Sequence, residues 1–115
     1  MDKSQLEEGN RILLVEDSQA DAYNMRVVLE SAGYKVTGIT GSGEHAISMI
    51  EETRPDLVIM DIYLAGQMDG VDVAEEILKH YNIPIIYVTV NIDDEKLQQA
   101  IETAPFGYIV KPVSK

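Results

Sequence analysis

Short apolar runs alternate with amphipathic segments along most of this chain. Apolar runs of four or five residues that are bounded by turn signals indicate strands buried on both faces, as parallel strands are. The strands predicted in this way cover residues 11–15, 34–40, 57–60, 85–89 and 107–110. The segments between them carry apolar residues at helical spacing. Regular alternation of strand and helix predicts an α/β fold with helices on both faces of a parallel sheet.

The four predicted helices have recognisable ends. Asp17 or Ser18 is expected to cap the first, Ser42 the second, and a turn at Asp69-Gly70 opens the third. Gly33 stands where a left-handed residue usually ends a helix. The fourth helix is short and begins near residues 93–95, where negative charge suits its dipole. The residues expected to face the core are Ala20, Tyr23, Val27, Val28, Ala46, Ile47, Ile50, Val73, Ala74, Ile77, Leu78, Leu97, Ala100 and Ile101.

Charged residues stand at the ends of three predicted strands. Glu16-Asp17 follows the first strand, Asp61 the third and Lys111 the fifth. In open α/β sheets, ligands bind outside the carboxyl ends of the strands, so these side chains are expected to converge there. Three clustered carboxylates repel one another unless a cation joins them. A divalent metal together with Lys111 balances their charge, which predicts a metal-dependent acidic pocket.

Composition narrows the possible functions. The 115 residues form one domain, which we expect to cover residues 11–115 after a flexible tail or linker at 1–10. There is no cysteine, which excludes disulfides, thiolate metal sites and cysteine nucleophiles. The net charge of −11 argues against direct binding to nucleic acid or to an anionic membrane. No apolar run approaches the roughly 20 residues of a membrane span, and the polar N-terminus does not read as a signal peptide. A cytoplasmic location is therefore expected.

When these charged residues are taken together with further motifs, the chain resembles the receiver domain of two-component response regulators over nearly its whole length. The residues that carry the resemblance occur in the family's order, each at the matching strand end: Glu16-Asp17, Asp61, Met68-Asp69-Gly70, Thr89, Tyr108 and Lys111-Pro112. The resemblance implies a doubly wound, five-stranded parallel sheet with the flavodoxin-like strand order 2-1-3-4-5.

The resemblance also implies a chemistry. Asp61 is expected to take a phosphoryl group from the phosphohistidine of a histidine kinase or of a histidine phosphotransfer protein. The implied Mg²⁺ ligands are Glu16, Asp17, Asp61 and the carbonyl of Tyr63. Lys111 and Thr89 are expected to contact the phosphoryl group, and Tyr108 to move with Thr89 as a switch. Such a domain catalyses only its own phosphorylation and dephosphorylation, and it signals to a downstream protein or output domain.

The chain departs from the family pattern at several points. Val90 stands where the family usually has alanine, and the loop after Asp61 lacks the usual proline and is one residue longer. The family's fifth helix has no counterpart in residues 112–115. We therefore expect the apolar positions of the first and fifth strands to be uncovered. Such a chain is expected either to associate through that face, as in a homodimer, or to be markedly less stable than a version extended by one amphipathic helix.

Three other readings use the same fold or the same nucleophile. A phosphohydrolase of haloacid-dehalogenase type needs a second aspartate where this chain has Tyr63. A flavin carrier needs a loop rich in serine, threonine and glycine after the first strand, where the acids Glu16-Asp17 repel phosphate. A pseudo-receiver, which keeps the fold as an interaction module without phosphorylation, stays open as the alternative.

Overall fold

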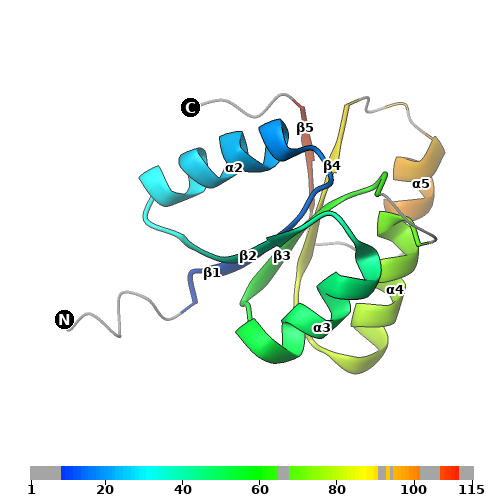
Figure 1. Cartoon of the computed structure of the whole chain (residues 1–115). Coiled ribbons are helices and arrows are strands. Elements are labelled where there is room, and N and C mark those ends of the chain that lie inside the picture. Colours follow the sequence, from blue (N-terminus) through cyan, green and yellow to red (C-terminus); the bar gives the residue numbers. More distant parts are fainter. Residues whose placement is uncertain (1–8, 65–67, 91–92, 94, 102–106, 112–115) are drawn as a thin grey trace.

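The structure is a computed structural model of the whole chain (Figure 1). It describes residues 9–64, 68–90, 93, 95–101 and 107–111. The predictions for residues 1–8 of the tail, for the lengthened loop at 65–67 and for the segment after Lys111 lie outside these residues.

The described residues form a five-stranded parallel sheet at the centre of the molecule. Its order is β2-β1-β3-β4-β5, which confirms the predicted doubly wound topology. The strands are β1 (Arg11–Val15), β2 (Lys35–Thr40), β3 (Leu57–Asp61), β4 (Ile85–Thr89) and β5 (Gly107–Val110). The helices between them are α2 (Gln19–Ser31), α3 (Gly43–Thr53), α4 (Gly70–His80) and α5 (Glu95–Ile101).

The helices divide unequally between the two faces of the sheet. Figure 1 shows α2 on one face and α3, α4 and α5 on the other. The larger core lies under the three helices and contains Leu13, Met60 and Tyr87 from neighbouring strands. The smaller core lies under α2, where Met25 packs against Leu14 and other residues of β1, β3 and β4. Side chains alternate between faces along a strand, so each strand feeds both cores.

Side-chain caps begin three of the helices at the predicted places. The Ser18 hydroxyl accepts a hydrogen bond from the Asp21 N–H at the start of α2, so Ser18 rather than Asp17 is the cap. The Ser42 hydroxyl caps α3, and Asp69 caps α4 in a reciprocal capping box. Gly33 has a φ of +95°, as predicted for the residue that ends the first helix.

The predicted inner face of α2 is wrong by a rotation about the helix axis. The buried residues are Ala22 and Met25, whereas Ala20 is exposed and Tyr23 is 70% exposed. A single helix over a twisted sheet buries only a narrow stripe, and several apolar residues of α2 compete for it. Leu78 of α4 is also exposed, contrary to prediction, because Val73, Ala74 and Ile77 already fill the contact with the sheet. The side chains of Ala100 and Ile101 lie outside the described part of α5.

The prediction of an uncovered first strand is wrong. Ile12 and Leu14 point toward α2 and are 2% and 0% exposed, because Met25 and Leu29 cover them. On β5, Ile109 lies beside Val88 on the same face and is partly exposed. Within the part of the chain that the structure describes, α2 therefore covers this face of β1, while Ile109 of β5 is only partly covered.

Candidate functional site

Strand register brings the charged residues to one edge and one face of the sheet. Asp61 is the last residue of β3 and pairs with Val88, which points toward α2. The Glu16 N–H donates to Thr40 O at 2.7 Å, so β1 continues its pairing by one residue. The Lys111 N–H likewise donates to Thr89 O at 2.7 Å. By alternation Glu16, Asp61 and Lys111 all lie on the α2 side, beyond the carboxyl ends of their strands.

Three carboxylates form a cluster at this edge. Glu16, Asp17 and Asp61 each offer an oxygen within 4.8 Å of the others. Glu16 and Asp61 are buried, at 3% and 6% exposure, while Asp17 is open to solvent. The loop after β2 runs close to the cluster, since a Cβ on Gly41 would lie 2.8 Å from the Asp17 Cα. An all-oxygen donor set of this kind suits a hard divalent cation.

Lys111 supplies the positive charge that the sequence predicted. Its Nζ lies 2.7 Å from Glu16 Oε1, 3.0 Å from Asp21 Oδ2 and 3.1 Å from Asp61 Oδ2. The contacts with Asp21 and Asp61 are hydrogen bonds. The contact with Glu16 Oε1 is ionic but lacks hydrogen-bond angles, and this buried oxygen has no hydrogen-bond partner among the described residues.

Burial and charge together perturb the ionisation of the cluster. Burial raises the pKa of Glu16 to about 7, and the neighbouring Asp61 carboxylate adds to the rise. The Lys111 ammonium and the Ser18 N–H act against that rise. Burial disfavours the charged form of Lys111, but its carboxylate neighbours outweigh that cost and raise its pKa above the ordinary value. The cluster thus holds more negative charge than one ammonium balances.

The backbone after β3 orients the Asp61 carboxylate. The Tyr63 N–H donates to Asp61 Oδ1 at 3.0 Å, while Oδ2 faces Lys111. The Gly70 N–H donates to Ile62 O at 2.7 Å, and a Cβ on Gly70 would lie 2.0 Å from the Asp61 carbonyl oxygen. Only glycine fits there without a backbone shift, so Asp69-Gly70 is structural, as the sequence indicated. The Tyr63 side chain is exposed, and its carbonyl as a metal ligand stays a prediction.

Thr89 and Tyr108 share the other face of the sheet. Thr89 ends β4 and is 2% exposed, and Tyr108 pairs with Tyr87 two residues earlier on that strand. Tyr87 belongs to the core under α3, α4 and α5, so Thr89 and Tyr108 point to that side as well. Tyr108 is 42% exposed. Val90, which follows Thr89, is 67% exposed.

Asp21 contacts the site although it was not among the predicted site residues. An acid in the first turn of a helix is ordinarily explained by the helix dipole, so nothing in its immediate surroundings marks it. Asp21 stands one helical turn after Asp17, a spacing that places both near the same end of α2. This spacing is the signal that could have found it.

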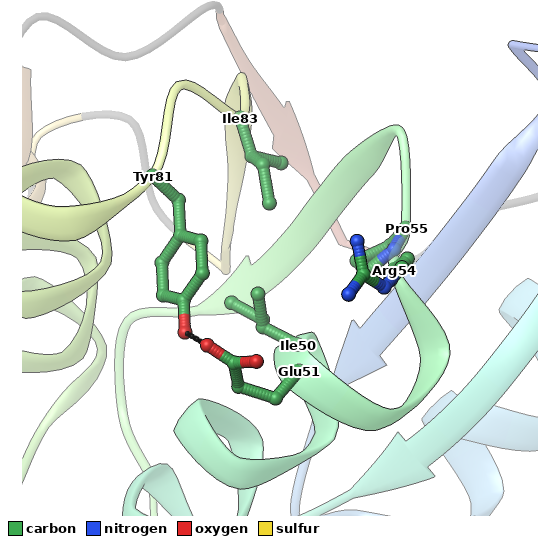
Figure 2. A pocket seen from close by; sticks show the side chains of 6 residues that line it. All are labelled: Ile50, Glu51, Arg54, Pro55, Tyr81 and Ile83. Carbon is green, nitrogen blue, oxygen red and sulfur yellow. Dashed lines mark hydrogen bonds between the residues drawn. The ribbon is translucent and has the colours of Figure 1, made fainter.

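A hollow lies where α3 and α4 end, before β3 and β4 begin, and Figure 2 shows the side chains that line it. This cavity of about 320 Å³ is lined by Ile50, Glu51, Arg54, Pro55, Tyr81 and Ile83. Its one lining carboxylate, Glu51, accepts a hydrogen bond from the Tyr81 hydroxyl. The carboxylates and Lys111 meet at the other edge, where the candidate site therefore lies.

Comparisons with known proteins agree with the fold and identify the family. The family model described as "Response regulator receiver domain" matches residues 12–115. The transcriptional regulatory protein PdtaR of Mycobacterium tuberculosis (strain CDC 1551 / Oshkosh) is 33% identical over 104 residues, which are 90% of this chain and 50% of PdtaR. The DNA-binding response regulator MtrA of Mycolicibacterium paratuberculosis is 34% identical over 89% of this chain and 44% of MtrA. The chain thus spans about half the length of these relatives.

Solved structures show the same architecture. The signal receiver domain of a modulated diguanylate cyclase from Desulfovibrio desulfuricans G20 has a TM-score of 0.83 and 41% identity, covering 90% of this chain and 82% of that one. The receiver domain of the sensor histidine kinase PA1611 from Pseudomonas aeruginosa PAO1 has a TM-score of 0.81 and 31% identity, covering 92% and 88%. That structure contains a magnesium ion coordinated in its active-site cleft. Among the described residues of our chain, no helix is long and apolar enough to cross a membrane.

Proposed function

The chain belongs to the response regulator receiver domain family of two-component systems, and from this membership we propose that Asp61 is its phosphoacceptor. The phosphoryl donor is the phosphohistidine of a histidine kinase or of a histidine phosphotransfer protein. In this proposal residues 11–115 form the receiver domain, which passes the signal to a downstream protein or output domain.

One observation carries the proposal. Asp61 lies in a cluster of three carboxylates and also within 3.1 Å of the Lys111 ammonium. A carboxylate needs no general base because it is already ionised at neutral pH, so its main obstacle is repulsion from an anionic phosphoryl group. A site that gathers cations around an aspartate is suited to lower that repulsion.

The cluster fits Mg²⁺ as the cofactor. Glu16 Oε1 is buried without a hydrogen-bond partner among the described residues, and burial raises the pKa of Glu16. An added cation would give this oxygen, which already lies 2.7 Å from Lys111 Nζ, a further positive partner, and it would oppose the effect of burial by favouring the ionised form of Glu16. Glu16, Asp17 and Asp61, with the Tyr63 carbonyl, would hold it. When bound, Mg²⁺ offsets negative charge on the transferring phosphoryl oxygens.

The transfer step is an exchange of one bond to phosphorus. A carboxylate oxygen of Asp61 forms the new P–O bond as the P–N bond of the phosphohistidine breaks, and the imidazole leaves with that electron pair. The Tyr63 N–H and the Lys111 ammonium keep the carboxylate oriented for this attack. In the resulting acyl phosphate the negative charge lies on the phosphoryl oxygens, which Lys111 and the Thr89 hydroxyl contact.

The switch in this proposal runs through Thr89 and Tyr108. Both point to the side of the sheet that carries α5, and Tyr108 lies at the surface beside Tyr87. Movement of Thr89 toward the phosphoryl group frees space on that side, and the Tyr108 ring takes it up. A small change of charge thereby becomes a change of the surface near α5.

The test is covalent modification followed by intact mass. The protein is incubated with acetyl phosphate with and without Mg²⁺, next to Asp61→Asn and Asp56→Asn. Asp61 is the last residue of β3, whereas Asp56 directly precedes the strand at its opposite end, where its Oδ2 accepts a hydrogen bond from the Arg11 N–H. We expect one phosphoryl adduct on the parent and on Asp56→Asn, dependent on Mg²⁺, and none on Asp61→Asn. Mg²⁺ binding without any adduct, from acetyl phosphate or from a phosphorylated histidine kinase, would favour the pseudo-receiver reading.

A further inference from the structure

Asp21 touches the site from a helix that carries none of the proposed metal ligands. Its backbone N–H is held by the Ser18 cap at 3.2 Å, which fixes it in the first turn of α2. Its carboxylate Oδ2 accepts a hydrogen bond from Lys111 Nζ at 3.0 Å, across 90 positions of sequence. The helix dipole alone does not require this long-range contact.

Lys111 is thus shared between the acidic cluster and a carboxylate outside it. An ammonium has three N–H donors, and three carboxylates lie within 3.1 Å of this one. The Glu16 and Asp61 side chains are 0% and 9% exposed, but the Asp21 side chain is 44% exposed. Asp21 therefore holds Lys111 from the solvent side, whereas the other two hold it from within.

We infer that Asp21 is a positioning residue that acts through Lys111 and competes with the phosphoryl group for its ammonium. The inference rests on the function proposed above. Before phosphorylation, the negative charge of Asp21 offsets part of the Lys111 charge beside the cluster. A bound cation is therefore repelled less by the ammonium. Once a phosphoryl anion is present, the Asp21 carboxylate repels it and keeps one Lys111 donor occupied. Asp21 thus has effects of opposite sign on the two ligands.

Because Asp21 is expected to affect the two ligands in opposite directions, its substitution can be distinguished from a loss of a purely structural contact. Mg²⁺ affinity is measured by calorimetry without any phosphoryl donor. The affinity for beryllofluoride, an anionic mimic of the phosphoryl group, is then measured at saturating Mg²⁺. In Asp21→Asn we expect Mg²⁺ to bind about two- to fivefold more weakly and beryllofluoride to bind more tightly by a similar factor, as for a half-exposed ion pair. Asp21→Glu keeps the charge and restores both affinities toward the parent. Glu30→Gln removes an acid from the far end of α2, where it pairs with Arg26, and leaves both unchanged.

A third measurement does not depend on phosphorylation or on metal. The ¹⁵N signal of the Lys111 ammonium is recorded in metal-free protein and assigned by its loss in Lys111→Arg. Hydrogen bonds to carboxylates slow the exchange of ammonium protons, so Asp21→Asn is expected to shift and broaden this signal and Glu30→Gln to leave it intact. An unchanged signal overturns the inference.

The affinities decide the remaining cases. Equal affinities in Asp21→Asn and parent, or a loss of both together, also overturn the inference. If the parent binds neither Mg²⁺ nor beryllofluoride, the proposed function fails. The ammonium signal then still decides whether Asp21 positions Lys111.

Discussion

The Lys111 ammonium reaches Asp61 Oδ2 at 3.1 Å although β4 lies between the strands that carry them. Neighbouring strands are about 4.8 Å apart, so this contact spans roughly two strand spacings. A long side chain at the end of β5 can cover that distance, whereas a short one cannot. The contact joins an edge strand to the centre of the sheet, and it places a cation beside the proposed nucleophile.

Removal of this cation is expected to weaken the metal-free fold and strengthen metal binding. In Lys111→Met, Glu16 and Asp61 lose their positive partner, and we expect the free energy of unfolding without Mg²⁺ to fall by about 1–3 kcal/mol. Mg²⁺ no longer competes with an ammonium, so it binds more tightly and restores part of the loss. Urea unfolding with and without Mg²⁺ measures both effects. Lys79→Met, which removes an exposed lysine paired with Glu76 at 3.8 Å, is the control. Weaker Mg²⁺ binding in Lys111→Met would contradict the charge argument.

Gly70 is expected to be intolerant of even one methyl group. Its added Cβ would lie 2.0 Å from the Asp61 carbonyl oxygen, a backbone atom that moves only if β3 moves. We expect Gly70→Ala to lower the free energy of unfolding by about 1–3 kcal/mol. Gly107→Ala is the matched control, because nothing lies within 4 Å of its added Cβ, and its effect stays within about 0.5 kcal/mol. Denaturant unfolding of both variants decides the point, and equal effects would show that the close approach is not limiting.

Strand positions could be predicted from the sequence because each buried run is short, apolar and bounded by turn residues, whereas the strand order followed only from the resemblance to receiver domains. The same pattern located Glu16, Asp61 and Lys111 at one edge, since parallel strands place their carboxyl ends together. Caps at Ser18 and Ser42 followed from local hydrogen bonding, which needs no tertiary contact.

Helix rotation and long-range side-chain contacts could not be predicted in this way. α2 has more apolar residues than its narrow contact can bury, and only the packed structure selects Ala22 and Met25 over Ala20 and Tyr23. The Asp21–Lys111 contact depends on where α2 lies on the sheet. The spacing of residues along the sequence does not determine where α2 packs on the sheet.

Asp69 is expected to stabilise α4 mainly as a cap and secondarily through an ion pair. Its side chain accepts from the Asp72 N–H at 3.0 Å and from Lys96 Nζ of α5 at 2.6 Å. We expect Asp69→Ala to cost about 1–2 kcal/mol at neutral pH, as other lost caps do. Lys96→Met removes a partly exposed ion pair and costs at most about 1 kcal/mol. Asp69→Asn keeps an oxygen that can accept the Asp72 N–H, so its loss of stability is expected to lie between those of Asp69→Ala and Lys96→Met.

Ionisation of Asp69 is expected to make the stability of the protein depend on pH in the acid range. Burial opposes ionisation of Asp69, but Lys96 and the Asp72 N–H outweigh it and hold its pKa below the ordinary 3.8. A lowered folded-state pKa stabilises the protein above 3.8, and this contribution is lost as the pH falls through the folded value. The difference in stability between parent and Asp69→Ala should therefore narrow in strong acid. A constant difference in urea unfolding across that range would refute the assignment.

Tyr81 is expected to ionise at a higher pH than an ordinary tyrosine because its hydroxyl donates a hydrogen bond to Glu51 (Figure 2). The hydrogen bond to the Glu51 carboxylate is the main cause that raises the Tyr81 pKa above 10.0. A raised folded-state pKa favours the neutral phenol, so its stabilising effect is complete below pH 10.0 and is lost as the pH rises through the folded value. Ultraviolet titration of the parent minus Tyr81→Phe isolates this phenol, and Tyr23→Phe controls for the loss of any one tyrosine. Glu51→Gln removes the charged acceptor and should move the difference curve to lower pH. A curve unaffected by Glu51→Gln would show that the carboxylate does not hold the Tyr81 proton.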